Sequence, residues 1–307
     1  MKGSIDSAKK SIDQIKKWVY SGDENRIKIF EMAEKIGLHI TPVHFYQPIP
    51  NTNEISSELF FKKKSFAEIN FREGEQIKLM EKFSKYSDEL KEIPLNQTSD
   101  KKQYYYENDF FGQMDAIMYY SMIREFSPKK IIEVGSGYST MIASLASKNT
   151  NTEISSIEPY PNEVLRSGLP NLTTLIKDKV QNVELEFFKK LDKNDILFID
   201  SSHISNIGSD VNYLMLEVLP NLKSGVLIHI HDWLFPNEYF LEWVLDRKLF
   251  WNEMYLVHAF LIGNQSYEIL LSNYHLITNH FEEYRKFFPF VKNNFAGGAG
   301  SLWIRKK

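Results

Sequence analysis

The segment Glu133-Val-Gly-Ser-Gly-Tyr-Ser-Thr140 decides the fold, because it joins an expected strand at 131–134 to an expected helix at 139–148. Apart from Glu133, the residues of the expected strand that precedes the glycines are apolar and β-branched, which favours a buried strand. Gly135 and Gly137 allow a tight turn and let the backbone approach a ligand closely. A plain structural turn would also use a Gly-x-Gly pair, so the pair indicates a ligand site only together with its neighbours.

Strands and helices alternate from this turn towards the C-terminus. Further strands are expected at 152–157, 173–176, 195–199 and 225–230, with a helix at 210–219 that ends at Pro220 and a turn at 293–300. Alternating strands and helices form right-handed βαβ units and a parallel, doubly wound sheet. Ligands bind beyond the carboxyl ends of the strands in such a sheet. The predicted fold class is therefore α/β, and the polar residues after each strand are the functional candidates.

The first hundred residues have a different texture. Charged helical stretches at 4–36 and 71–90 flank the segment Thr41–Pro50, whose prolines exclude a regular helix. We therefore expect residues 1–103 to form a helical and irregular N-terminal extension, acting as a lid or as an acceptor-recognition region. Residues 104–307 are expected to form the ligand-binding domain.

Composition excludes several classes of protein. The chain has 307 residues, of which 43% are hydrophobic and 25% charged, as expected for a globular protein with a large core. A net charge of −3 gives nucleic acid or an anionic membrane no global electrostatic support. The lack of cysteine excludes disulfides, thiolate zinc sites, iron–sulfur clusters and cysteine catalysis. Without a secretory signal or a long apolar run, we expect a cytoplasmic protein.

Two acidic residues narrow the identity of the ligand expected at the glycine turn. Glu133 lies two residues before the first glycine, where a carboxylate is costly unless it has a partner. Glu158 ends the second expected strand, where it can accept hydrogen bonds from a ribose diol. A glycine turn followed by such an acid also describes a dinucleotide site, but Thr140 replaces the third glycine of that fingerprint. Glu133 would also repel a pyrophosphate and attract a cation, so S-adenosylmethionine, which carries an ammonium group and no phosphate, fits better.

The glycine segment resembles the first motif of class I S-adenosylmethionine-dependent methyltransferases. That resemblance implies a seven-stranded, mostly parallel, Rossmann-like sheet, with the sixth and seventh strands at 267–271 and 301–305 and the seventh antiparallel. A closer likeness is to methyltransferase family 24, on the basis of Phe198-Ile-Asp-Ser-Ser-His203, His229-Ile-His-Asp232, Pro236 and Trp251-Asn-Glu-Met-Tyr255. The cofactor-binding residues implied are Glu133, Gly135, Ser136, Gly137, Tyr138, Ser139, Glu158, Asp178 and Asp200.

The segments that end in His203 and Asp232 follow adjacent central strands, so both should point into one cleft. A histidine with a pKa near neutrality suits removal of a hydroxyl proton during methyl transfer. We predict His203 or His231 as the base, with Asp232 orienting it; core packing of His229 and a helix-capping role for His203 are the alternatives. Asp200 and Asp232 also resemble the metal-binding positions of catechol-type O-methyltransferases, which would suit Mg²⁺, although Trp233 replaces the asparagine ligand expected there.

The function expected from these features is S-adenosylmethionine-dependent O-methylation of a small-molecule or sugar-like acceptor. O-methylation is preferred to N-methylation because the histidines and carboxylates are suited to deprotonating a hydroxyl. Two alternatives stay open: a nicotinamide-dependent oxidoreductase or epimerase, and a non-catalytic cofactor-binding subunit. The expected partner is a small-molecule or carbohydrate acceptor, with neither nucleic acid nor a membrane.

Overall fold

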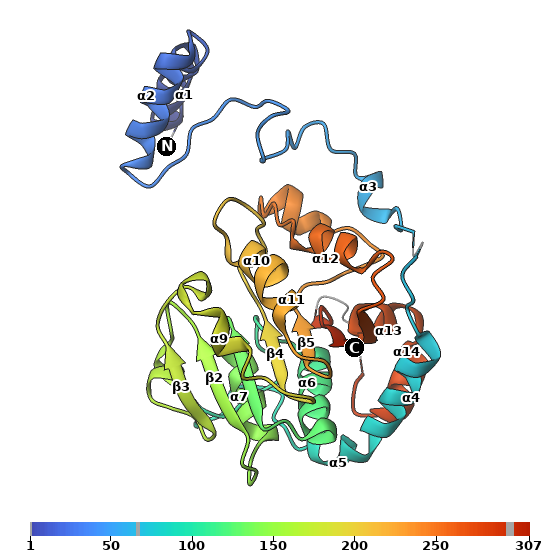
Figure 1. Ribbon diagram of the computed structural model, residues 1–307. Helices are drawn as coiled ribbons and strands as arrows, with labels where there is room; N and C mark the ends of the chain where they lie inside the picture. Colours follow the sequence, from blue (N-terminus) through green and yellow to red (C-terminus); the bar gives the residue numbers. More distant parts are fainter. Residues whose placement is uncertain (1, 66–67, 293–297) are drawn as a thin grey trace. The chain divides into compact units, whose positions relative to one another are not determined.

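The computed structural model describes residues 2–65, 68–292 and 298–307 (Figure 1). Its centre is a seven-stranded sheet in the order β3-β2-β1-β4-β5-β7-β6. The strands are β1 (Lys130–Val134), β2 (Glu153–Ile157), β3 (Leu172–Ile176), β4 (Ile196–Ile199), β5 (Leu227–Ile230), β6 (Tyr267–Ser272) and β7 (Leu302–Lys306). Strands β1 to β5 are parallel, and β7 is antiparallel to both β5 and β6. The predicted fold class, its doubly wound sheet and the antiparallel seventh strand are confirmed.

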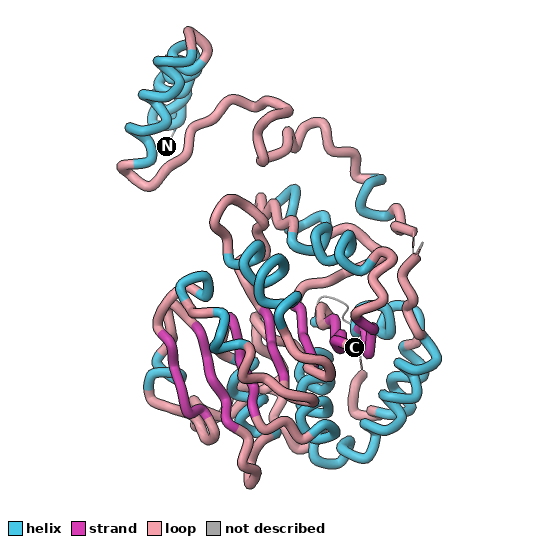
Figure 2. Tube along the Cα trace, in the orientation of Figure 1, coloured by secondary structure: helices cyan, strands magenta, loops and turns pink. Residues whose placement is uncertain are grey.

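The helical elements of the described residues range from single turns to α1, which has 18 residues. The helices of the described residues are α1 (Lys2–Val19), α2 (Asp23–Glu34), α3 (Glu58–Phe61), α4 (Glu73–Phe83), η1 (Ser84–Tyr86), α5 (Ser87–Leu90), α6 (Gln113–Phe126), α7 (Tyr138–Ala146), α8 (Glu163–Arg166), η2 (Val180–Asn182), α9 (Leu185–Phe188), α10 (Asp210–Tyr213), η3 (Leu214–Val218), α11 (Leu219–Asn221), η4 (Glu242–Asp246), α12 (Glu253–Leu261), α13 (Asn273–Asn279) and α14 (Phe281–Phe287). Helix α6 packs against α7, and α9 packs against η3. Figure 2 shows the strands of the sheet in magenta with helices in cyan beside them.

The centre of the sheet and the adjoining helix α6 are deeply buried. Every residue of β4 and β5 is buried, as expected for strands covered on both faces. Residues Met114–Ile123 of α6 are also all buried. Each fully buried large aliphatic side chain stabilises the fold by about 1.5–3 kcal/mol, so the ends of β4 and β5 provide a firm base for a functional site.

The helix expected at 210–219 continues beyond Pro220. Its middle part, η3, is a π-helical turn, and Pro220 lies in the first turn of α11. A proline in a regular helix removes a hydrogen bond and clashes with the carbonyl four residues earlier. The wider π turn accommodates the proline, so the helix ends at Asn221 instead.

Contacts between residues divide the chain into two compact units. One comprises residues 1–59 and 242–250, and the other residues 60–241 and 251–307. In the first unit α1 packs against α2; in the second α4 packs against β6 and α14. Residues 60–103 therefore belong to the same unit as the sheet, and a functional boundary between residues 103 and 104 stays a prediction.

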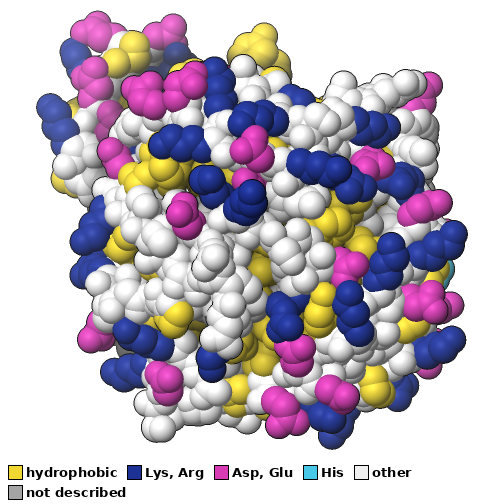
Figure 3. Space-filling view, turned by 60° about the horizontal axis from the view of Figure 1, so that its bottom comes forward, with side chains coloured by type: hydrophobic (Ala, Val, Ile, Leu, Met, Phe, Trp, Pro, Cys, Tyr) yellow, Lys and Arg dark blue, Asp and Glu magenta, His cyan; other side chains and the backbone are white. Residues whose placement is uncertain are grey.

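Surface charge agrees with the balanced composition. Basic and acidic side chains are interspersed over the face drawn in Figure 3. Within the described residues, no helix has the length and apolar character needed to cross a bilayer. The turn expected at 293–300 lies mostly outside the described residues.

Candidate functional site

The glycine turn between β1 and α7 packs directly on the end of β4. Gly135 has a φ of 76°, and a Cβ atom added to it would lie 1.8 Å from the backbone oxygen of Asp200, so only glycine fits there. Gly137 differs, because a Cβ atom added to it would meet nothing nearer than Nδ2 of Asn162 at 3.7 Å. Packing within the protein does not require glycine at position 137, whereas a ligand that approached the backbone would.

Glu133 lies on β1 with its side chain fully buried. Its Oε1 accepts a hydrogen bond from the Tyr119 hydroxyl at 2.9 Å, and its Oε2 has no hydrogen-bond partner in the described part of the chain. Burial raises the pKa of Glu133 to about 7, although the hydroxyls of Thr140 and Tyr119 act in the opposite direction. A buried carboxylate that is only partly satisfied favours a cationic donor beside it.

Two more acids follow β2 and β3. Glu158 accepts a hydrogen bond from the Ser136 backbone nitrogen at 3.3 Å and one from the Tyr160 backbone nitrogen at 2.8 Å. This places the carboxylate of Glu158 against the glycine turn. Asp178 is exposed and accepts hydrogen bonds within its own loop, from Nδ2 of Asn182 and the backbone nitrogen of Lys179. These hydrogen bonds lower the pKa of Asp178.

The remaining residues of the turn lead into α7. The Ser136 hydroxyl accepts a hydrogen bond from the Ser156 hydroxyl at 2.7 Å, which ties the turn to β2. Tyr138 stacks on Phe110 with ring centroids 5.6 Å apart, and Ser139 is buried. The structure therefore gathers the predicted residues from 133 to 139, Glu158 and Asp200 at neighbouring strand ends.

A cluster of charged side chains lies beyond the carboxyl ends of β4 and β5. Nε2 of His203 lies 3.3 Å from Oδ1 of Asp200 and 3.5 Å from Oδ2 of Asp232. Nδ1 of the same ring lies 2.8 Å from Oε2 of Glu253. The adjacent parallel pairing of β4 and β5 brings these segments together, as the sequence predicted. His203 is buried, so the surface-capping alternative does not describe it.

Two of these residues have unusual backbone conformations. His203 and Asp232 have φ values of 59° and 53°, in the left-handed region that non-glycine residues seldom adopt. A Cβ atom added to Gly300 would lie 3.0 Å from the Cα of Asp232, so the chain approaches Asp232 very closely. Strained positions of this kind cluster at functional sites.

The charges in the cluster depend on one another. Burial acts to lower the pKa of His203, but hydrogen bonds to Asp200 and Glu253 and the charge of Asp232 raise it well above 6.5. Burial acts to raise the pKa of Asp200, but the charges of His231 and His203 outweigh it and lower this pKa to about 2. His203 is therefore protonated at neutral pH, and Asp200 is ionised.

The two histidines of β5 and its end differ in character. His229 is fully buried, donates to or accepts from the Ser301 hydroxyl at 2.9 Å and stacks on Phe198 at 3.9 Å between centroids. Burial lowers its pKa well below 6.5, so His229 is a neutral core histidine. Nε2 of His231 lies 3.7 Å from Oδ1 of Asp232. Burial opposes a charge on His231, but nearby carboxylates, Asp200 first among them, raise its pKa.

Sequence reasoning missed two buried acids. Glu253, at the start of α12, is 2% exposed and also accepts a hydrogen bond from the Ser201 hydroxyl. Asp115 on α6 accepts hydrogen bonds from Nδ2 of Asn273 and from the backbone nitrogens of Gly300 and Ser301. The sequence did contain a signal for both residues: each is an acid within an apolar helical pattern. A buried acid of this kind needs a partner.

Glu253→Gln tests how much the buried pair of Glu253 and His203 contributes to stability. The amide can still accept a hydrogen bond from Nδ1 of His203, but the charge is gone, so we expect the free energy of unfolding at pH 7 to fall by about 1–3 kcal/mol. Urea denaturation measures this change. Glu186→Gln is the control, because the Glu186 side chain is 77% exposed and should hardly affect stability. Equal stability of the two variants would contradict the importance of the pair.

The cluster fits a divalent cation poorly. Nε2 of His203 lies within 3.5 Å of an oxygen of Asp200 and of an oxygen of Asp232, so the ring already partners both candidate carboxylates. Mg²⁺ prefers a shell of oxygen ligands with several waters, and an imidazole between the two carboxylates supplies no oxygen.

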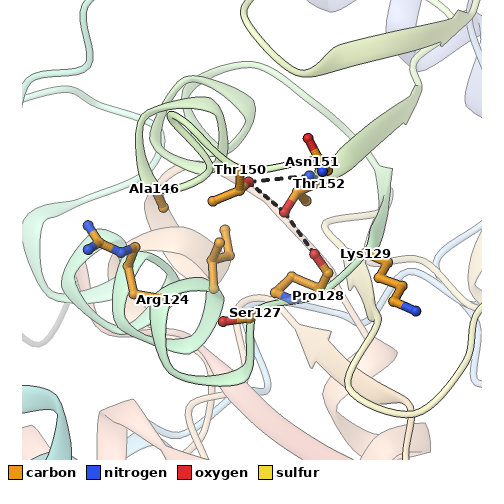
Figure 4. A pocket seen from close by; sticks show the side chains of 9 residues that line it. Arg124, Ser127, Pro128, Lys129, Ala146, Thr150, Asn151 and Thr152 are labelled. Atoms are coloured by element: carbon orange, nitrogen blue, oxygen red, sulfur yellow. Dashed lines mark hydrogen bonds between the residues drawn. The ribbon is translucent and has the colours of Figure 1, made fainter.

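A separate cavity of about 250 Å³ lies at the amino ends of β1 and β2. It is lined by Ile123, Arg124, Ser127, Pro128, Lys129, Ala146, Thr150, Asn151 and Thr152 (Figure 4). Thr152 donates a hydrogen bond to the Pro128 carbonyl, which closes one wall. Because its loops precede β1 and β2, the cavity lies away from the carboxyl strand ends and is no part of the candidate site.

Sequence comparison relates the chain to known proteins. A family model described as a methyltransferase domain matches residues 132–233, which include the glycine turn and extend just past Asp232. An uncharacterised protein of Archaeoglobus fulgidus is 36% identical over 173 residues, covering 53% of this chain and 78% of the relative.

Solved structures with a similar arrangement include methyltransferases. One is the methyltransferase PaMTH1 of Podospora anserina bound to S-adenosylhomocysteine, at 15% identity, covering 75% of this chain and 88% of that one with a TM-score of 0.42. Another is the O-methyltransferase TomG of Streptomyces achromogenes, at 12% identity, with coverage of 74% and 88% and a TM-score of 0.40.

Proposed function

Because the chain belongs to the class I S-adenosylmethionine-dependent methyltransferases, we propose that it methylates a hydroxyl oxygen of a small-molecule or sugar-like acceptor. One observation carries the proposal. Two histidines and two ionisable aspartates meet beyond β4 and β5, beside the turn of Gly135. This arrangement combines hydrogen-bond acceptors for hydroxyl groups with a group that can take a proton.

The glycine turn and its acids would hold the cofactor. When bound, S-adenosylmethionine supplies a methyl group already activated by a positively charged sulfur. Glu133 would meet the ammonium group, since its Oε2 has no hydrogen-bond partner among the described residues. Glu158 would accept hydrogen bonds from the ribose, and Asp178 from the adenine amino group. The open space around Gly137 supports a close approach of the ligand to the backbone.

His231 is the base that this geometry favours. An efficient base has a pKa near the working pH, and nearby carboxylates move the pKa of His231 upward from 6.5. Asp232 would stabilise the imidazolium that forms when His231 accepts the hydroxyl proton. His203 is already charged and would instead fix the positions of Asp200 and Asp232. Alignment of the hydroxyl with the methyl group supplies most of the remaining rate enhancement.

Calorimetric titration tests the cofactor assignment. We expect saturable binding of S-adenosylhomocysteine in buffer with EDTA and no binding of NADH, because Glu133 repels a pyrophosphate. Binding of NADH alone would overturn the proposal in favour of an oxidoreductase or epimerase.

An acceptor panel tests the reaction. Hydroxyl compounds are offered beside their deoxy and amino counterparts, and release of S-adenosylhomocysteine is followed. Turnover confined to the hydroxyl compounds supports O-methylation, and turnover confined to amines contradicts it. Cofactor binding without turnover on any acceptor would favour the non-catalytic subunit.

A further inference from the structure

A second group of titratable side chains lies where α4 begins and where α13 passes into α14. It consists of Glu73, the first residue of α4, His275 on α13 and His280, which precedes α14. None of the three belongs to the strand ends described above. In the described part of the chain, this is the set of three whose ligand-type atoms lie within 4.8 Å of one another.

All three side chains converge on one oxygen atom. Oε1 of Glu73 lies 2.8 Å from Nε2 of His275 and 2.5 Å from Nε2 of His280. His275 and His280 have side-chain exposures of 9% and 21%, whereas Glu73 is about half exposed at 49%. Two imidazole nitrogens thus face one carboxylate oxygen from a partly enclosed position.

From this convergence we propose that Glu73, His275 and His280 bind one divalent transition-metal ion of the zinc type. Two imidazoles and a carboxylate are a ligand set of zinc sites that leave the fourth position to water. Imidazole ligands disfavour Mg²⁺ and Ca²⁺, which prefer oxygen. The absence of cysteine from the chain does not exclude such a site, because it contains no thiolate.

The hydrogen bonds of the cluster show which atoms would face the ion. A carboxylate oxygen only accepts hydrogen bonds, so both Nε2 atoms carry a proton when they face Oε1 of Glu73. A metal ion would take the place of these two protons, since imidazole binds a metal through a ring nitrogen that carries no proton.

The surrounding groups would hold the ligands in place. Nδ1 of His275 lies 3.2 Å from the side-chain amide of Asn279, the type of outer contact that orients a metal-binding imidazole. The Phe71 ring packs edge-on against His275 at 4.5 Å between centroids. Ligands about 2.0–2.1 Å from a tetrahedral zinc ion lie roughly 3.3 Å apart. The half-exposed Glu73 needs to withdraw by less than about 1 Å to reach that spacing.

The ion would join parts of the chain that are distant in sequence. Helix α4 packs against β6 and α14, and Gln76 on α4 accepts a hydrogen bond from the backbone nitrogen of Ser272. A metal shared by α4 and the α13–α14 junction would strengthen this packing. Its effect would therefore be on stability rather than on methyl transfer.

Zinc titration of the full-length protein, without a polyhistidine tag and after removal of metals by a chelator, tests the proposal. We expect one zinc ion per chain and a rise in the melting temperature on saturation. His280→Gln and Glu73→Gln should each weaken zinc binding by more than the roughly 10- to 100-fold that loss of an outer hydrogen bond costs. Both positions are partly exposed, so both variants should fold; circular dichroism checks this.

Two controls locate the ion. His39→Gln removes an exposed histidine that faces Glu34 at 3.4 Å, and Asp232→Asn alters the strand-end cluster. Neither should change zinc affinity. The proposal is overturned if the wild-type protein binds no zinc, if His280→Gln binds it equally well, or if Asp232→Asn rather than His280→Gln abolishes binding. In the first case the three side chains form only a hydrogen-bonded contact between helices.

Discussion

Glu133→Gln is expected to weaken binding of S-adenosylhomocysteine roughly 10- to 150-fold, because a hydrogen bond to a charged group contributes about 1.5–3 kcal/mol. Glu133 is the buried carboxylate that we assign to the ammonium group of the ligand, with one oxygen free of hydrogen bonds to the described residues. Glutamine keeps the shape of the side chain but removes its charge. Calorimetry at pH 8, where the wild-type carboxylate is ionised, measures the loss.

The same substitution is expected to stabilise the ligand-free protein at pH 8. Burial raises the pKa of Glu133 from 4.5 to about 7, so the native state retains a proton that the unfolded state releases. The resulting stability is complete below pH 4.5 and is lost as the pH rises through 7. At pH 8 the ionised side chain therefore costs about 3 kcal/mol, and glutamine avoids that cost.

Urea denaturation between pH 5 and pH 8 measures this second effect. The free energy of unfolding of Glu133→Gln should exceed that of the wild type by an amount that grows with pH. The affinity of the wild type for S-adenosylhomocysteine should rise over the same pH range. Glu153→Gln, at the exposed start of β2, should show neither trend. A variant that bound the ligand as the wild type does would remove Glu133 from the cofactor site. Lower stability at every pH would instead indicate a purely structural carboxylate.

Local sequence patterns were sufficient to predict most of the sheet. The apolar runs of β4 and β5 can only be buried on both faces, and the glycine turn at Gly135 follows β1 directly. Parallel order then places the end of each strand at one edge, so Glu158, Asp200 and Asp232 could be grouped without a structure. The meeting of His203 with two aspartates follows from the adjacency of β4 and β5.

The contributions of distant segments could not be predicted in this way. Glu253 reaches His203 because the backbone nitrogens of Asn252 and Glu253 both donate to the His203 carbonyl, a contact across fifty residues that no local pattern indicates. Asp115 likewise accepts a hydrogen bond from the backbone nitrogen of Ser301, which is 186 residues away in the sequence. The charge of His203 depends on Glu253, so its role could not be separated from that of His231 until Glu253 was located.

His231→Gln is expected to lower kcat by roughly 10²- to 10⁴-fold, the usual contribution of a positioned base, while leaving affinity for S-adenosylhomocysteine unchanged. The ring lies beside Asp232 and has a raised pKa. Below that pKa the ring already holds its proton and cannot accept another. Wild-type kcat should therefore increase with pH to a plateau, with a midpoint above 6.5, and the variant should lose this acidic limb.

Release of S-adenosylhomocysteine from the hydroxyl acceptor that the panel identifies provides the rate. His258→Gln on α12 is the matched control and should keep both the wild-type kcat and the acidic limb. Asp232→Asn should lower kcat less than His231→Gln, because the base remains and only the stabilisation of its charged form is lost. Unchanged turnover in His231→Gln would show that another group takes the proton. If EDTA abolished turnover and Mg²⁺ restored it, a metal ion rather than the imidazole would activate the hydroxyl. A histidine base by itself needs no metal ion, so its turnover should not respond to EDTA.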